Sequence, residues 1–150
     1  EMEESDWSSD VCSSDLHGSP LPDGTTGWFC DIGKGRTLYI RDGTEIDGAS
    51  VPRIAWVFVG HPLSRRLLPS ALCHDLLYIT EALPRNECDA IFYYHLRHRA
   101  TIAHASACWS GVRVGGGIPW LLHKEADIAA AREQCWITTS NGLTLAFPGR

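Results

Sequence analysis

The sequence has 150 residues, of which 44% are apolar and 21% charged, and these are the size and composition of one ordinary globular domain. No apolar run approaches the roughly 20 residues that a membrane-spanning helix needs, so the transmembrane and disordered classes are excluded. The net charge of −5 arises in the first sixteen residues, which hold six of the 18 acids; the remaining 12 acids and 13 bases leave +1, which predicts no nucleic-acid partner.

Residues 1–16 differ from the rest of the chain, because they contain five serines, few apolar residues and no periodicity. The stretch from Asp6 to Leu16 resembles the translation of a short-read sequencing adapter fused to a reading frame, as occurs in metagenomic assemblies. We therefore expect a disordered or artefactual tail over 1–16 and a single domain over 17–150; a genuine acidic tail is the alternative. On this interpretation the native start is not visible, and a signal peptide would lie before it.

The first predicted elements are two short strands, 28–32 and 36–41, around the glycine turn 33–35. After the turn dipeptides at 42–43 and 47–48, a short helix is expected to begin at Ser50, because a capping Ser with Pro in the first turn is typical of a helix start. The amino-terminal third is therefore predicted to be mainly β-structure.

Four helical patterns follow, over 67–80, 84–99, 102–114 and 118–134. The first two are separated by only about three residues, which predicts an antiparallel helical hairpin. The chain closes with alternating runs on either side of Asn141-Gly142, a strong hairpin signal. The predicted fold class is α+β: a small domain with a central antiparallel helical hairpin and further helices, flanked by β-hairpins.

The cysteines outside the tail are odd in number and contain no C-x-x-C pair, which argues against a zinc site and against a complete disulfide framework. We expect reduced, packed thiols, and these favour a cytoplasmic setting. The five residues are Cys30, Cys73, Cys88, Cys108 and Cys135.

The helical hairpin brings together candidate catalytic residues. If it turns near Ala82, His74 lies eight residues before the turn and Asp89 seven after it, so the two side chains lie at the same height on adjacent helices. A carboxylate on one imidazole nitrogen leaves the other free to take a proton from water or a hydroxyl. Tyr78, one turn after His74, is expected to hydrogen-bond Asp89. The alternative is a buried histidine that is only structural.

A second group of residues is expected to bind ligands. Asp75 points about 100° away from His74 and is predicted to bind a hard cation, with calcium as the candidate, together with loop carbonyls. A solvent-exposed or helix-bonded carboxylate is the alternative. The loop 47–53 is expected to fold over the amino-terminal half of the His74 helix and to supply substrate-binding groups; a plain turn and helix cap are the alternative. The loop residues concerned are Asp47, Ser50 and Arg53. Arg85 is expected either to contact substrate or to pair with Glu81 or Asp89.

Three segments carry a family resemblance: Asp47 to Arg53, His74-Asp75-Leu76-Leu77-Tyr78, and Arg85 with Asp89 to Phe92. Together they resemble the family of short phage and prophage proteins known as domain of unknown function 1353, over about residues 28–114. The resemblance implies a phage or prophage origin and a small single-domain architecture. It implies no particular activity.

A more remote resemblance concerns the helix pair itself. His74-Asp75-x-x-Tyr78 on one helix, with Asp89 on its antiparallel neighbour, is similar to the catalytic helices of secreted phospholipases A2. There the histidine activates water, the adjacent aspartate binds calcium, and the distant aspartate and a tyrosine orient the histidine. The chain departs from that pattern at Leu77, where those enzymes have a cysteine, and in lacking their glycine-rich calcium loop.

Two functions follow as hypotheses. The first is a small, metal-assisted hydrolase of esters or phosphodiesters with a His/Asp dyad, acting on a small-molecule or lipid ester. The second is a noncatalytic phage accessory or structural protein, with a phage or host protein partner, in which the His-Asp pair joins two helices. Metal-dependent phosphohydrolases with a His-Asp dipeptide are a third possibility, but they need further helix-borne ligands. An open, polar pocket over His74 would favour the first and a sealed His74 the second. The remaining histidines, His61, His95, His98, His104 and His123, are predicted to have no functional role.

Overall fold

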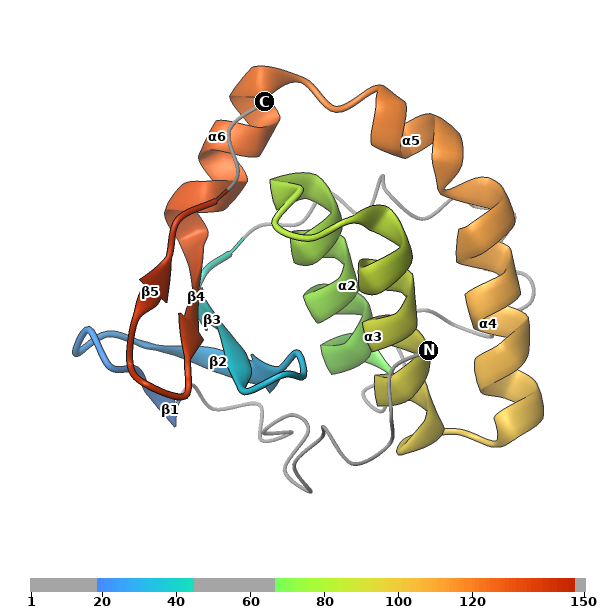
Figure 1. Ribbon diagram of the computed structural model, residues 1–150, viewed down its shortest axis with the longest axis horizontal. Helices are drawn as coiled ribbons and strands as arrows, with labels where there is room; N and C mark the ends of the chain where they lie inside the picture. The colour runs from blue at the N-terminus through green and yellow to red at the C-terminus, as the bar shows by residue number, and fades with distance from the viewer. Residues whose placement is uncertain (1–18, 45–66, 148–150) are drawn as a thin grey trace. The chain divides into compact units, whose positions relative to one another are not determined.

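The computed structural model describes residues 19–44 and 67–147 (Figure 1). The chain divides into two compact units. Within the described ranges, a sheet unit combines residues 19–44 with 132–147, and a helical unit holds 67–131. Both helices and strands are present, and the predicted α+β class is confirmed.

The sheet unit is one antiparallel sheet of five strands in the order β1-β2-β3-β4-β5. The strands are β1 Ser19–Pro20, β2 Thr26–Asp31, β3 Arg36–Arg41, β4 Cys135–Thr139 and β5 Thr144–Leu145. Both predicted hairpins are present, as β2–β3 and β4–β5. In addition β3 pairs with β4, so the two ends of the chain form a single sheet.

The two faces of this sheet differ in burial, as the alternation along antiparallel strands requires. Leu38 and Ile40 of β3 are fully buried. Tyr39, between them, is half-buried and stacks on Trp136 across the strand pair, with ring centroids 5.3 Å apart. The guanidinium of Arg41 lies 4.9 Å from the Trp136 ring centroid. Gly27 of β2 is required because a Cβ there would overlap the Ile40 carbonyl.

The helical unit begins with the predicted hairpin, formed by α2 Leu68–Thr80 and α3 Arg85–Arg97. A proline lies in the first turn of α2 and another immediately before α3, as expected of helix starts. Helix α4, Ile102–Gly115, is capped by Thr101, whose side chain accepts a hydrogen bond from the His104 amide. Helix α3 lies between α2 and α4 (Figure 1).

The single helix predicted over 118–134 is wrong. The structure has two helices there, α5 Gly117–Leu121 and α6 Glu125–Gln134. The amide of Leu122 donates to the carbonyls of both Ile118 and Pro119, a tightened last turn that ends α5. His123 then pairs with Glu81, 42 residues earlier in the chain, a contact that local periodicity cannot reveal.

The cysteines of the described ranges are buried thiols with no disulfide among them, as predicted. Burial raises the pKa of the Cys135 thiol to about 12, and it also raises the pKa of the Cys88 thiol. These thiols are therefore packing residues rather than nucleophiles. Among the helices of residues 67–134, none has the length and apolarity to cross a membrane.

Candidate functional site

The centre of the site is a hydrogen bond between the two antiparallel helices of the hairpin. His74 on α2 donates from Nε2 to Oδ1 of Asp89 on α3, at 2.9 Å. Both are buried, with His74 4% and Asp89 0% exposed. The predicted contact is therefore confirmed. Because an ionised carboxylate only accepts, the bond places a proton on Nε2 and leaves Nδ1 as the titrating nitrogen.

Asp75 lies beside that second nitrogen. Its Oδ1 is 3.6 Å from His74 Nδ1, within ion-pair range but too far for a hydrogen bond. The 100° between neighbouring helix positions separates the Cα–Cβ directions, but the imidazole is wide enough to bring Nδ1 back toward the carboxylate. Asp75 Oδ1 is buried without a hydrogen-bond partner, so two polar atoms with unused hydrogen-bonding capacity lie close together.

The charges of the site act on one another. Burial is the largest influence on the pKa of His74 and lowers it, but Asp75 and Asp89 together outweigh burial and raise the pKa of His74 above 6.5. Burial likewise raises the pKa of Asp89, yet its bonds to His74 and Arg113 outweigh burial and hold that pKa below 3.8. Each partner therefore favours the charged form of the other.

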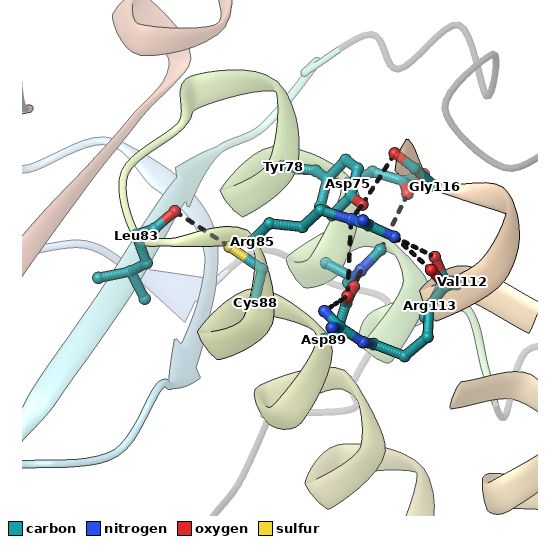
Figure 2. Close-up of polar contacts among 10 residues, drawn as sticks. Asp75, Tyr78, Leu83, Arg85, Cys88, Asp89, Val112, Arg113 and Gly116 are labelled. Carbon is teal, nitrogen blue, oxygen red and sulfur yellow. Dashed lines mark hydrogen bonds and ion pairs between the residues drawn. The ribbon is translucent and has the colours of Figure 1, made fainter. Parts of the chain in front are cut away.

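Tyr78 does not hydrogen-bond Asp89, so this prediction is wrong. Its hydroxyl donates to the Gly116 carbonyl at 3.0 Å and accepts from Arg85 Nε at 2.5 Å (Figure 2). The first contact uses the single hydroxyl proton, and both contacts draw the hydroxyl toward the end of α4. The tyrosine ring still borders the site, because its centroid lies 4.8 Å from that of His74, and Phe92 lies at 4.7 Å.

Two arginines surround Asp89, as Figure 2 shows. Arg113 Nη1 donates to Asp89 Oδ2 at 2.9 Å, and Arg85 Nε lies 3.9 Å from the same oxygen. The predicted choice for Arg85 is thus resolved in favour of Asp89. Arg85 Nη2 also donates to the carbonyls of Val112 at 3.1 Å and Arg113 at 2.5 Å, which ties α3 to α4.

Sequence reasoning missed Arg113. It lies 24 residues after Asp89, in the last turn of a helix rich in small residues. A positive charge is favourable there because of the helix dipole, so the sequence gives no sign of a second role. It also missed the reason for Gly116, where a Cβ would lie 2.6 Å from the Val112 carbonyl and would overlap the Tyr78 hydroxyl. Ser70, one turn before His74, was overlooked too; its Oγ is buried without a hydrogen-bond partner.

Four of the residues singled out in the sequence lie outside the described residues: Asp47, Ser50, Arg53 and His61. His123, which was predicted to have no functional role, has a carboxylate beside it: its Nδ1 lies 3.3 Å from Glu81 Oε1. Glu81 has a left-handed backbone at φ 49°, directly after α2.

The described residues do not by themselves make a metal site. Over 19–44 and 67–147, no group of three or more His, Cys, Asp or Glu side chains is arranged to hold an ion. Asp75 is a single carboxylate with two oxygens, whereas calcium takes six to eight oxygen ligands.

Comparison with known proteins gives a family but no activity. The chain is 28% identical over 78 residues to "Uncharacterized protein y4jT" of Sinorhizobium fredii (strain NBRC 101917 / NGR234). That match covers 52% of this chain and 23% of that protein. No solved structure matches the chain. The model of the family described as "Protein of unknown function (DUF1353)" matches residues 26–112, which include His74, Asp75 and Asp89, and the chain belongs to this family.

Proposed function

We propose that this protein is a small hydrolase of esters or phosphodiesters in which His74 is the general base. One observation carries the proposal: Asp89 holds Nε2 of His74, while Nδ1 faces the unbonded Oδ1 of Asp75 at 3.6 Å. When the imidazole is neutral, both facing atoms are acceptors, so one molecule that donates to both would satisfy them. Water is the simplest such molecule.

The chemistry requires one proton to move out and back. A water that donates to Nδ1 and to Asp75 Oδ1 has its lone pairs free to attack a carbonyl carbon or a phosphorus atom. As the new C–O or P–O bond forms, Nδ1 takes the water proton. The imidazolium, stabilised by Asp89, then returns that proton to the leaving alkoxide as the bond to it breaks.

The surrounding contacts serve to position the base. Arg113 bonds the oxygen of Asp89 that His74 does not use, which fixes the carboxylate plane. The rings of Tyr78 and Phe92 lie against the imidazole, with centroids 4.8 Å and 4.7 Å from its own, and limit its rotation. These are positioning residues, and their effect on turnover is expected to be smaller than that of His74.

The remaining features of the proposal come from the sequence. The substrate is a small-molecule or lipid ester, by analogy with the phospholipase A2-like helix pair. Asp47, Ser50 and Arg53 bind it, and the protein acts in a phage or prophage setting as a single domain over 17–150. Calcium, if bound by Asp75, would polarise the ester or phosphoryl oxygen.

The second candidate is a noncatalytic phage accessory or structural protein. It is favoured by the burial of His74 and by the ties that Arg85 and Arg113 make between α3 and α4. In that case the cluster holds three helices together and no bound molecule is required.

Hydrolysis by three single variants separates the candidates. We expect wild type to hydrolyse at least one member of a panel of chromogenic esters and phosphodiesters, assayed with and without calcium. His74→Gln is expected to lose about 100-fold or more in kcat/KM, the usual contribution of a general base, and Asp89→Asn to lose activity as well. His95→Gln is the matched control, since His95 is a fully buried histidine on α3 outside the cluster.

Circular dichroism must show each variant folded at the assay temperature. Turnover that survives in His74→Gln would contradict the proposal. Absence of turnover in wild type over the whole panel, with large losses of stability in both cluster variants, would favour the structural candidate.

A further inference from the structure

Two guanidinium groups share one carboxylate at the edge of the site. Arg113 Nη1 is 2.9 Å and Arg85 Nε 3.9 Å from the same oxygen of Asp89 (Figure 2). Within the described ranges, Asp89 is the one acid that pairs with either arginine. The other acid of the site, Asp75, lies beside the second nitrogen of His74. The two arginines therefore carry one positive charge more than the carboxylate between them can balance.

The arginines also have donors that the protein does not use. Arg85 donates from Nε to Tyr78 and from Nη2 to two carbonyls, and Arg113 donates from Nη1 to Asp89. Among the described residues, nothing accepts from Arg85 Nη1 or from Nε and Nη2 of Arg113. The two side chains are 25% and 37% exposed, so a solute can reach them. The contacts that they do make position both guanidiniums before a ligand binds, which favours affinity.

Gly117, the first residue of α5, leaves the approach to Arg85 open. A Cβ at this position would lie 3.4 Å from Arg85 Nη1 and 3.9 Å from Arg85 Cζ, which are ordinary contact distances. The backbone of Gly117 is not left-handed, so the fold tolerates a side chain there. A larger side chain would cover Nη1. Access to Nη1 therefore explains the glycine, which backbone geometry does not require.

The unused donors suit the oxygens of a phosphate group. A guanidinium is planar and donates in parallel pairs that match phosphate or carboxylate oxygens, and the excess positive charge selects an anion. Three nitrogens from two side chains exceed the two oxygens of a carboxylate, whereas a phosphate monoester presents three terminal oxygens. Phosphate is therefore the better fit to this pair of arginines.

We propose that Arg85 and Arg113, with Gly117 beside them, bind the phosphate group of a small molecule or of a lipid headgroup. That this ligand is also the substrate rests on the proposed function, and it makes the substrate a phosphate ester rather than a neutral ester. In that case the arginines anchor the substrate while His74 acts as the base.

Titration with inorganic phosphate, from about 0.1 to 50 mM at constant ionic strength, tests the site directly. The Nε–H signal of Arg113 in nitrogen-15 NMR is expected to shift and to saturate. Gly117→Val is expected to raise the dissociation constant at least about tenfold, because its side chain covers Arg85 Nη1. Arg113→Gln is expected to do the same by removing a cation. Circular dichroism should show both variants folded.

Arg97→Gln and Ala103→Val are the matched controls. Arg97 is an exposed arginine at the end of α3, and Ala103 is an exposed small residue in the first turn of α4. Both variants should leave the dissociation constant unchanged. A wild type whose signal does not saturate would overturn the proposal. Equal weakening by Arg97→Gln and Arg113→Gln would also overturn it, and so would an unchanged constant in Gly117→Val.

Vesicles distinguish the two sources of the phosphate group. Cosedimentation with phosphatidylcholine vesicles that contain phosphatidic acid, lost in Gly117→Val, would assign a lipid headgroup. Saturable phosphate binding without cosedimentation would assign a small molecule. Binding is measured without turnover, so a wild type that binds phosphate but hydrolyses nothing retains this site and rejects the hydrolase. Hydrolysis of neutral esters without phosphate binding does the reverse.

Discussion

Removing the carboxylate of Asp89 is the most informative single perturbation of this molecule. Asp89 is fully buried, and its two oxygens bond His74 at 2.9 Å and Arg113 at 2.9 Å, with Arg85 at 3.9 Å. In Asp89→Ala these three basic groups remain without their shared anion. Breaking a buried pair by deleting one partner typically costs about 3 to 5 kcal/mol.

Two features place the expected loss near the lower end of that range. Arg85 and Arg113 are partly exposed, so water screens their interaction with Asp89 and restores part of their solvation. His74 is buried, but it can lose its proton once the carboxylate is gone, which avoids an isolated buried charge. We therefore expect Asp89→Ala to lower the free energy of unfolding by about 3 kcal/mol.

Urea denaturation at pH 7 measures this loss. With a slope of roughly 1 to 3 kcal/mol per molar urea, the midpoint should fall by about 1 to 3 M. Asp89→Asn keeps the shape and one acceptor oxygen, so its loss should be smaller. A loss below about 1 kcal/mol in Asp89→Ala would refute the account, because it would mean that the three basic groups do not depend on this carboxylate.

Three further predictions concern stability. Because the pKa of His74 is raised above 6.5 in the folded state, the stabilisation that its charged imidazole provides is present below pH 6.5 and is lost as pH rises through the raised pKa. Thermal melts in this window should show this loss of stability, and His74→Gln should remove the pH dependence. Gly116→Ala, whose Cβ overlaps the Tyr78 hydroxyl, should cost about 1 to 3 kcal/mol in chemical denaturation, whereas Gly117→Ala, 3.4 Å from a flexible Arg85 nitrogen, should cost less. Deleting residues 1–16 should change stability by no more than about 0.5 kcal/mol, and a melting temperature lowered by many degrees would show otherwise.

The central contact was predictable because it depends only on local rules. The rise of a helix and the position of one turn suffice to place His74 opposite Asp89. The Asn141-Gly142 turn likewise specifies β4–β5, and the glycine turn at 33–35 specifies β2–β3. Each of these features joins residues that are close in sequence, so periodicity and turn chemistry carry the information.

What could not be predicted joins residues that are distant in sequence. The pairing of β3 with β4, the bond from Arg113 to Asp89 and the pair His123–Glu81 all depend on how helices and strands come together. The hydroxyl of Tyr78 illustrates the consequence. Its position on α2 was right, but the Gly116 carbonyl and Arg85 compete for it, and neither competitor is visible in the spacing of the hairpin.

Nitrogen-15 NMR of the imidazoles, followed from pH 5 to pH 9 in wild type and in Asp89→Asn, tests most directly whether Asp89 holds His74 as a base with Nδ1 available. The account predicts that neutral His74 carries its proton on Nε2, that its pKa lies above 6.5, and that Asp89→Asn lowers this pKa. A His74 that titrates at or below 6.5 in wild type, or whose neutral form carries the proton on Nδ1, would contradict it.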